Sequence, residues 1–531
     1  MYRVMIRDNM SHVAREILEA TGKIEVVVDN DKSTSEPNVL ARLVSEYDGL
    51  AIRSETRITR EVLAQAKRLK VIGRAGIGVD NIDTKEATRR GLVVMNAPGG
   101  NTVTTAEHAI SMLLSLSRNI PQATASIRAG KWEKKQLVGT EITGKTLGIV
   151  GLGQIGRIVA KRAQGLEMTV IAADPFVSRE AAAALNVKLV AIDELYRRAD
   201  FISLHVPRMK ETVNMINRDS LAQMKTGVRL INCSRGEIVN LEDLSAAIDA
   251  EKVAGAALDV FPQEPPPAEL SILQHPKVIF TPHLGASTGE AQKKVATMIA
   301  NQIAAYLIDG IISNAVNFPS VSQEVMEQIR PHLNLAEKMG ALMGQLIDKA
   351  YNVAISYTGE VARLDTQPLT HAILKGYLGA FSDIPVNYVN APALASDKGI
   401  KVREQVQRDV KDDFAGVIRL QLEGYEKGPD EIWGTIFAKV HPRIVRLGRI
   451  YMDALPEGFM LVIQNVDKPG VIGNVGTTLG RHEINIGRFQ LGRLRGQALC
   501  MVNIDTEADE SVLADLRKLP NIISVKQVKL G

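Results

Sequence analysis

A glycine-rich turn near residue 150 constrains the fold of this chain more than any other feature. The apolar run 147–150 leads into the turn G-L-G-Q-I-G, from Gly151 to Gly156, and a helical pattern follows directly. Glycines at this spacing permit a tight turn between a strand and a helix and let the helix pack closely on the strand. The segment therefore predicts the start of a βαβ unit in a parallel sheet covered by helices.

The residues around the turn indicate a ligand. Unpaired N–H groups at the start of the helix suit a pyrophosphate. Asp174 ends the next β-like run, 169–174, where its carboxylate can accept hydrogen bonds from both ribose hydroxyls and would repel a 2′-phosphate. We therefore expect the cofactor to be NAD rather than NADP. The alternative is a glycine turn that serves packing alone.

The chain is long enough to form several domains, because 531 residues exceed what one core supports. Residues 1–98 alternate short β-like runs with helical patterns, and a second such pattern from residue 144 contains at least six strands. We expect an α/β protein with two doubly wound parallel-sheet domains, the first flavodoxin-like and the second of the Rossmann type. Residues 320–455 mix amphipathic helices with strands, which predicts an α+β domain. Residues 459–531 follow the ferredoxin-like order β-α-β-β-α-β.

Composition argues against several classes of protein. A net charge of +4 and an aromatic content of 4% do not suit nucleic-acid binding, although the weak positive charge suits a phosphorylated metabolite. The chain has no apolar stretch of membrane-spanning length and no apolar signal-peptide region at its N-terminus, so we expect no membrane partner. Two cysteines, Cys233 and Cys500, indicate a reducing, cytoplasmic location. No metal site is expected.

Three ionisable side chains follow strands of the second parallel pattern. They are Arg235 in N-C-S-R-G-E, Glu264 in D-V-F-P-Q-E-P and His283 in T-P-H-L-G-A-S. Ligands of open α/β sheets bind beyond the carboxyl ends of the strands. A guanidinium can clamp the carboxylate of a keto acid, a histidine can exchange the C2 hydroxyl proton, and a carboxylate can fix the tautomer of that histidine. The set indicates hydride transfer with a small 2-hydroxy acid, although each residue alone could be structural.

These motifs resemble those of the D-isomer-specific 2-hydroxyacid dehydrogenases. The matching segments are G-L-G-Q-I-G, L-I-N-C-S-R-G-E, A-A-L-D-V-F-P-Q-E-P and T-P-H-L-G-A-S-T. The resemblance implies that His283 is the acid/base, that Glu264 orients it and that Arg235 anchors the substrate. It also assigns a set of residues to cofactor binding: Ile77, Gly151, Gly153, Gln154, Ile155, Gly156, Asp174, Val206, Pro207, Cys233, Ser234, Arg235, Asp259, His283, Gly285 and Ala286.

The first domain resembles the phosphoglycerate dehydrogenase branch of that family, through R-A-G-I-G-V-D-N-I-D at 74–83 and A-P-G-G-N-T-V-T-T-A-E at 97–107. The resemblance implies that the backbone amides of Ile77 and Gly78 receive the substrate carboxylate. The side chains that it places around the substrate are Arg53, Arg74, Asn101 and Thr102. Two arginines suit a doubly charged phosphate, and the alternative is a pair of local ion pairs.

The loop G-K-W-E-K-K at 130–135 resembles a loop with which family members contact a neighbouring subunit. Trp132 would then anchor a dimer interface. Lys134 or Lys135 could add charge to the partner's phosphate pocket, or could simply be solvated. We expect a homo-oligomer, either a dimer or a tetramer.

Residues 459–531 resemble an ACT domain, an amino-acid-sensing module, through N-V-D-K-P-G-V-I-G-N-V-G-T-T-L-G from residue 465. The resemblance implies that Asn465, Asp467 and Asn485 hold an amino-acid effector, here L-serine. The alternative is a role in assembly alone.

Residues 320–455 resemble the intervening domain of the longest members of the family, by position and length more than by motif. Lys439, Arg443, Arg446 and Arg449 form a basic patch there, which we interpret as one face of a helix. The patch either binds an anion, as an allosteric substrate site would, or is a solvated surface.

Four domains are therefore expected: substrate-binding (1–98 and 284–318), NAD-binding (99–283), intervening (319–455) and ACT (456–531). The resemblance implies oxidation of 3-phospho-D-glycerate to 3-phosphohydroxypyruvate with NAD+, the first step of L-serine biosynthesis. One alternative is a glycerate or hydroxypyruvate reductase. Another is an NAD-sensing, corepressor-like interaction protein.

Overall fold

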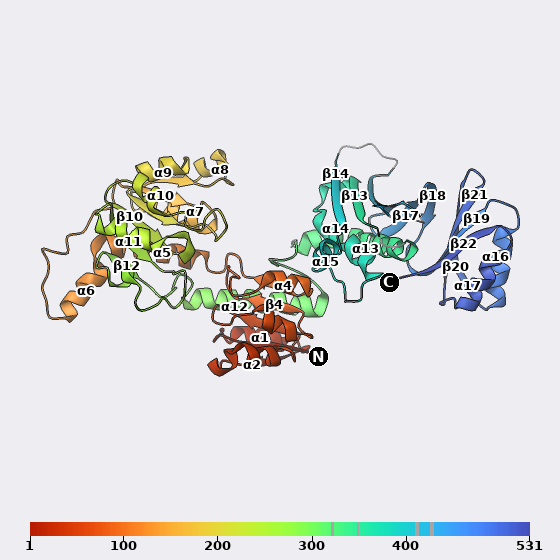
Figure 1. Ribbon diagram of the computed structural model, residues 1–531, viewed down its shortest axis with the longest axis horizontal. Helices are drawn as coiled ribbons and strands as arrows, with labels where there is room; N and C mark the ends of the chain where they lie inside the picture. The colour runs from red at the N-terminus through yellow and green to blue at the C-terminus, as the bar shows by residue number, and fades with distance from the viewer. Residues whose placement is uncertain (320–322, 348–349, 409–413, 425–428) are drawn as a thin grey trace.

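The computed structural model describes residues 1–531 except 320–322, 348–349, 409–413 and 425–428. Four sheets follow one another along the chain, and Figure 1 shows the two parallel sheets as separate bodies bridged by helix α12. The remaining two sheets lie side by side at the opposite end of the molecule (Figure 1). The expected fold class is confirmed: two parallel α/β sheets, a mixed sheet and an antiparallel ferredoxin-like sheet.

The first sheet has five parallel strands in the flavodoxin-like order β2-β1-β3-β4-β5. Helices α1 and α12 cover one face, and α2, α3 and α4 cover the other. The strands are β1 (Tyr2–Ile6), β2 (Ile24–Val28), β3 (Gly49–Ile52), β4 (Val71–Arg74) and β5 (Val93–Asn96). The helices are α1 (Val13–Ala20), α2 (Pro37–Val44), α3 (Arg60–Gln65), α4 (Thr84–Arg89) and α12 (Gly289–Asp309), with a 3-10 turn η1 (Lys32–Ser35).

The second sheet has seven parallel strands in the order β12-β11-β10-β9-β6-β7-β8. The strand order reverses between β6 and β9, which is where open α/β sheets bind ligands. The strands are β6 (Thr146–Val150), β7 (Thr169–Ala173), β8 (Lys188–Leu189), β9 (Phe201–Leu204), β10 (Val228–Asn232), β11 (Val253–Leu258) and β12 (Val278–Phe280). The two-residue strand β8 is an addition to the six that the sequence pattern indicated.

Helices cover both faces of the second sheet. Helices α5, α7 and α8 pack on one face, and α9, α10 and α11 pack on the other. Their bounds are α5 (Thr102–Arg118), α6 (Ile120–Arg128), α7 (Gln154–Gly165), α8 (Arg179–Ala183), α9 (Ile192–Arg198), α10 (Arg218–Gln223) and α11 (Leu241–Asp249), with η2 (Gly236–Ile238) and η3 (Ser271–Gln274).

The third sheet is mixed, with the order β14-β13-β15-β16-β17-β18, and only β13 and β14 run parallel. Its elements are α13 (Gln323–Leu346), β13 (Asn352–Gly359), η4 (Glu360–Arg363), α14 (Gln367–Gly379), α15 (Ala391–Asp397), β14 (Lys401–Gln407), β15 (Gly416–Glu423), β16 (Glu431–Phe437), β17 (His441–Leu447) and β18 (Ile450–Ala454). The helical interpretation of the basic patch is wrong: Arg443 and Arg446 lie on strand β17, which pairs with β16 and β18.

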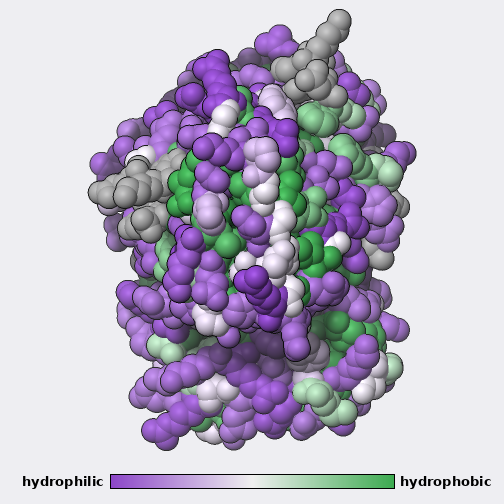
Figure 2. All heavy atoms as spheres, turned by 90° about the vertical axis from the view of Figure 1, so that its right-hand side faces the viewer, coloured by the Kyte–Doolittle hydropathy of each residue, from purple (hydrophilic) through white to green (hydrophobic). Residues whose placement is uncertain are grey.

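The fourth sheet is antiparallel, in the order β20-β21-β19-β22. Its elements are β19 (Gly458–Val466), α16 (Val471–Arg481), β20 (Ile486–Leu494), β21 (Gln497–Ile504), α17 (Glu510–Arg517) and β22 (Ile522–Leu530). Helices α16 and α17 cover one face. The other face packs on α13 and joins the core of the third sheet. Figure 2 shows this end of the molecule as mostly purple, with green side chains on either side of a white strip.

Among the helices that the structure describes, none combines the length and the apolar character needed to cross a bilayer.

Candidate active site

The glycine turn connects β6 to α7. Gly151 has φ of 94°, a left-handed conformation that favours glycine. A Cβ atom on Gly156 would lie 2.2 Å from the carbonyl oxygen of Gly151, whereas Gly153 is surrounded by open space. Gly153 is also the N-cap of α7 and supplies no side-chain cap. The first N–H groups of α7, which include those of Gln154 and Ile155, are therefore accessible to a pyrophosphate.

Asp174 lies beside this turn, directly after β7. Its Oδ2 atom accepts a hydrogen bond of 2.8 Å from the backbone N–H of Leu152, inside the turn. A ribose carried by a pyrophosphate at the turn would meet this carboxylate. Val206 approaches the same turn from the end of β9, since its Cγ1 atom would lie 2.9 Å from a Cβ on Gly151, and Pro207 follows it. The open cradle, the uncapped helix and the adjacent carboxylate fit NAD.

His283 and Glu264 form the pair that the sequence suggested. The Nδ1 atom of His283 lies 2.7 Å from Oε2 of Glu264, and the second oxygen of Glu264 accepts a hydrogen bond from the backbone N–H of Phe261. Burial would raise the pKa of Glu264, but the hydrogen bond and charge of His283 outweigh burial and lower that pKa. Both side chains remain partly exposed. The ring is thus held at Nδ1, and its Nε2 atom is left for a substrate.

Arg235 reaches from the second sheet to the first domain. It follows β10, and its Nε atom donates to Oδ2 of Asp80 over 2.9 Å. A Cβ on Gly78 would lie 2.0 Å from the Nη2 atom of Arg235, so this approach depends on glycine there. Ile77 lies in the same loop, and its carbonyl oxygen accepts a hydrogen bond from Asn96. The structure therefore brings Arg235 to the loop expected to receive the substrate carboxylate.

Arg74 is nearly buried and close to two other guanidiniums. Burial, followed by the charge of Arg235, lowers its pKa to about 10, while Asp80 opposes the shift and Arg53 adds to it. Among the described residues, the Nε atom of Arg74 has no hydrogen-bond partner. Arg53 is tied to Asp8, whose carboxylate accepts its backbone N–H over 2.7 Å. Arg74 therefore lies in the field of two further guanidinium groups, and an anion bound there would be stabilised.

Asn101 is the N-cap of helix α5, and Thr102 is its first residue. The buried Oδ1 atom of Asn101 has no partner among the described residues, and the Thr102 hydroxyl donates to the carbonyl oxygen of Gly99 over 3.3 Å. An orphaned buried acceptor is what a substrate hydroxyl could satisfy.

Four residues of the site were missed by the sequence reasoning. Asp80 and Asp8 are the counterions of the arginine cluster. His108 and Thr105 of α5 contact the end of β12 and the turn after it. The family-like segment 97–107 ends one residue before His108, and no neighbouring residue in the sequence indicates the partner of that histidine.

Asp259 is buried at the end of β11 and accepts four hydrogen bonds, from His108, Thr281, Leu284 and Gly285. Cys233 lies close by, and burial followed by the charge of Asp259 raises its thiol pKa well above the ordinary value. His108, Cys233 and Asp259 bring one candidate metal-ligand atom each within 4.8 Å. Both carboxylate oxygens of Asp259 already accept hydrogen bonds from the chain, so the geometry shows a hydrogen-bond network around Asp259.

Three other residues expected at the cofactor lie along the same edge. Ser234 follows Cys233 and bonds the side chain of Asn232 through its N–H and its hydroxyl. Gly285 and Ala286 lie between His283 and helix α12. A Cβ on Gly285 would lie 3.1 Å from Oδ2 of Asp259, so the backbone passes close to that carboxylate.

The three residues predicted to bind an effector each have a separate partner. Asn465 is buried and donates to the carbonyl oxygen of Val466 over 2.9 Å, and Asp467 pairs with Arg493 at 3.4 Å. Asn485 donates to Asp505 over 2.7 Å. Within the described chain, no hydrogen bond joins the three to one another.

Half of the basic patch is neutralised within the chain. Arg443 pairs with Asp453 at 3.1 Å, and Arg446 pairs with Glu431 at 3.3 Å while its guanidinium lies over the ring of Trp433. Lys439 and Arg449 lie in the turns on either side of β17. Two of the four charges are therefore already compensated.

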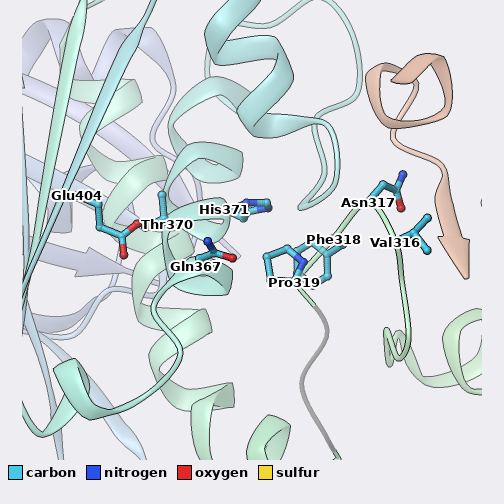
Figure 3. A pocket seen from close by; sticks show the side chains of 8 residues that line it. All are labelled: Val316, Asn317, Phe318, Pro319, Gln367, Thr370, His371 and Glu404. Carbon is cyan, nitrogen blue, oxygen red and sulfur yellow. Dashed lines mark hydrogen bonds between the residues drawn. The ribbon is translucent and has the colours of Figure 1, made fainter. Parts of the chain in front are cut away.

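A pocket of about 420 Å³ lies between the end of the first domain, at residues 316–319, and the third sheet with its helix α14. Figure 3 shows Phe318 and Pro319 on one side, with His371 and Gln367 of α14 near them and Glu404 of β14 at the far end. The Nδ1 atom of His371 donates to the carbonyl oxygen of Tyr388 over 2.9 Å, and burial lowers the pKa of this histidine. No residue expected to act in catalysis lines the pocket.

Comparison with known proteins agrees with the fold of the successive domains. Residues 110–285 match the model of the D-isomer specific 2-hydroxyacid dehydrogenase NAD-binding domain. Residues 328–448 match the D-3-phosphoglycerate dehydrogenase intervening domain, and residues 459–521 match the ACT domain. The solved TT0316 protein from Thermus thermophilus is 33% identical with a TM-score of 0.54, over 59% of this chain and 99% of that one.

The family assignment rests on relatives that match this chain along its full length. The D-3-phosphoglycerate dehydrogenase of Synechocystis is 40% identical over all of this chain and 95% of its own length. That of Bacillus subtilis is 38% identical over the whole of both chains. The chain therefore belongs to the D-3-phosphoglycerate dehydrogenase family, a branch of the NAD-dependent D-isomer specific 2-hydroxyacid dehydrogenases.

Proposed function

We propose that the protein oxidises 3-phospho-D-glycerate to 3-phosphohydroxypyruvate with NAD+, the first step of L-serine biosynthesis. The observation that carries this proposal is the arginine cluster beside an acid/base pair. Arg53, Arg74 and Arg235 are close enough for the charges of the others to lower the pKa of Arg74. A substrate that carries both a carboxylate and a phosphate would relieve this repulsion.

His283 takes the proton of the C2 hydroxyl in this scheme. Glu264 accepts the hydrogen bond from Nδ1, which leaves Nε2 as the base and stabilises the imidazolium that forms. NAD+, when bound at the glycine turn, supplies the acceptor for the hydride that leaves C2.

Arg235 holds the substrate carboxylate and polarises the developing carbonyl. It is positioned for this by Asp80, which fixes its Nε atom, and by Gly78, which leaves room for Nη2. The amides of Ile77 and Gly78 lie in the same loop and complete the carboxylate site. The other two arginines, Arg53 and Arg74, then face the phosphate.

The test compares NADH oxidation with 3-phosphohydroxypyruvate and with unphosphorylated hydroxypyruvate. Hydride transfer from an isolated alcohol to NAD+ is uphill at neutral pH, so the reduction is the sensitive direction. We expect kcat/KM to be at least about 100-fold higher for the phosphorylated acid, because a doubly charged group meets desolvated arginines. Equal kcat/KM values would indicate a hydroxypyruvate reductase. Turnover of neither 2-oxo acid would indicate an interaction protein.

The assembly that we propose is a homo-oligomer built on the loop after α6. Trp132 is 82% exposed and Val138 is 77% exposed, which is unusual for large apolar side chains. A second copy would cover them, with Lys134 and Lys135 beside its phosphate site. Light scattering of the intact protein should give a dimer or a tetramer, and Trp132→Ser should shift the dimer toward monomer.

The effector that we propose for the ACT domain is L-serine, at Asn465, Asp467 and Asn485. Support comes from the family of the domain and from the polar side chains at the β19–α16 turn. The free, buried thiols of Cys233 and Cys500 fit a reducing compartment, and we place the protein in the cytoplasm.

A further inference from the structure

The turn that carries His283 is wrapped around one buried carboxylate. The backbone N–H of His283 donates to the carbonyl oxygen of Asp259 over 2.9 Å. The next two amides, of Leu284 and Gly285, donate to the Asp259 side chain over 2.7 and 2.9 Å. Asp259 is only 1% exposed, so these amides are its solvation. The backbone around His283 is therefore fixed by Asp259.

His283 needs such support because its own backbone conformation is unfavourable. Its φ is 54°, in the left-handed region that residues with a Cβ rarely adopt. Such a backbone conformation persists only where the surrounding contacts hold it in place. The hydrogen bonds to Asp259 hold it on one side of the turn.

Helix α5 holds the same turn from the other side. The Nε2 atom of His108 lies 3.1 Å from Oδ1 of Asp259 and 3.0 Å from the hydroxyl oxygen of Thr281. The hydroxyl of Thr105, one helical turn earlier, donates to the carbonyl oxygen of Gly285 over 2.9 Å. The carboxylate is ionised, because burial would raise its pKa but the bonds from His108 and Thr281 lower it. An ionised carboxylate can only accept hydrogen bonds, so the Nε2 atom of His108 must carry the proton that it donates to Asp259.

We propose that His108 and Thr105 are positioning residues for His283, and that they act through Asp259 and the turn 281–285. The proposal rests on the acid/base role of His283 proposed above. Loss of the His108 donor leaves a buried carboxylate short of one hydrogen bond. The turn then relaxes toward another donor, and the His283 ring moves away from Glu264 and from the hydroxyl of the substrate. A displacement of about 1 Å at a reacting group is enough to cost about 100-fold in rate.

The first experiment measures kcat and NADH affinity in full-length variants. His108→Ala should lower kcat by about 10- to 100-fold, because the base is misplaced. The Kd of NADH, read by fluorescence, should rise by less than kcat falls: Asp259 and Gly285 are expected at the cofactor, but the glycine turn and Asp174 are untouched. His108→Gln keeps a donor near the Nε2 position and should recover most of kcat. His275→Ala is the matched control, since His275 pairs with Asp249 at 3.3 Å in the same domain but contacts no part of the turn. Wild-type kcat in His108→Ala would overturn the proposal.

The second experiment reads the turn without catalysis. Hydrogen exchange of the peptide 281–287 should speed up in His108→Ala and in Thr105→Val, and not in His275→Ala. The imidazole ring resonances of His283, followed by NMR, should shift in both variants because the contact of the ring with Glu264 loosens. Unchanged exchange and unchanged His283 ring resonances would contradict the proposal even if kcat fell. Thr105→Val nearly preserves side-chain shape, so it provides the test if His108→Ala does not fold.

These readouts separate two kinds of failure. If the wild-type protein turns over no 2-oxo acid, the proposed function fails. Hydrogen exchange and the His283 ring resonances still show whether α5 holds the turn. If turnover is normal and the variants match wild type in every readout, the positioning role alone is excluded.

Discussion

At the scale of single residues, Asp174 is the side chain that we expect to decide which cofactor the site accepts. Its carboxylate is held against the glycine turn by the N–H of Leu152 and would lie close to a 2′-phosphate. Asp174→Ala should raise the ratio of kcat/KM for NADPH over NADH by about 10-fold or more, since one repulsion and two ribose hydrogen bonds disappear together. Steady-state kinetics with both cofactors is the measurement. An unchanged ratio would mean that another residue sets the preference.

Removal of the His283 side chain gives a second prediction at the scale of single residues. His283→Ala should lower kcat by roughly 10²- to 10⁴-fold, because no other histidine pairs with Glu264 in the described structure. NADH binding should survive, since the glycine turn and Asp174 belong to β6, α7 and β7. Fluorescence titration with NADH checks binding, and stopped-flow absorbance checks turnover. Near-wild-type turnover would remove His283 from the acid/base role.

At the scale of helices and strands, the sequence predicted the features that short local motifs determine. The strand–glycine–helix transition at β6 and α7, the parallel alternation of the first two domains and the strand ends that carry Arg235 and His283 all follow from short motifs. Strand β14 escaped notice because all but its last residue are exposed and it forms a sheet edge, so no apolar periodicity marks it. Strand β17 was taken for a helix because its arginines share a pattern with a solvated helix face.

Contacts between distant parts of the chain could not be predicted in the same way. His108 meets Asp259 across 151 positions of sequence, and Arg235 meets Asp80 across 155. Each partner is ordinary in its own segment, and only the packing of α5 and of the first domain against the second sheet brings them together. The motifs therefore indicated the candidate reacting groups, while the groups that hold those side chains in place became visible only in the structure.

The loop between β4 and α4 gives a prediction at this scale. Gly78→Ala places a methyl group 2.0 Å from the present position of Nη2 of Arg235, so the guanidinium must move. We expect KM for the 2-oxo acid to rise about 10-fold with little change in Tm, because Gly78 itself is only partly buried. Gly165→Ala is the control, since that glycine has open space around it and lies at the end of α7. Equal KM values in the two variants would contradict the role given to Gly78.

At the scale of the whole molecule, the third and fourth sheets share one core. Met460, Val462, Met501 and Val528 are buried against the core that α13 and α14 build with the third sheet. Gln345, near the end of α13, exchanges hydrogen bonds of 3.0 and 2.9 Å with the backbone of Lys529 in β22. The ACT sheet thus has helices α16 and α17 on one face and the intervening domain on the other. Its removal would expose apolar surface on both partners.

A truncated chain of residues 1–455 should therefore be less stable than the intact protein. Each large apolar side chain buried at the shared core contributes about 1.5–3 kcal/mol, so the unfolding transition of the intervening domain should fall by more than about 10 °C. Differential scanning calorimetry of the truncated and intact chains measures this shift. Gln345→Ala in the intact chain removes only hydrogen bonds and should lower Tm by much less. NADH binding to the truncated chain should persist, because the glycine turn and Asp174 lie in a separate core. A truncated chain that melts like the intact one would show that the ACT sheet is only tethered to the intervening domain and does not stabilise it.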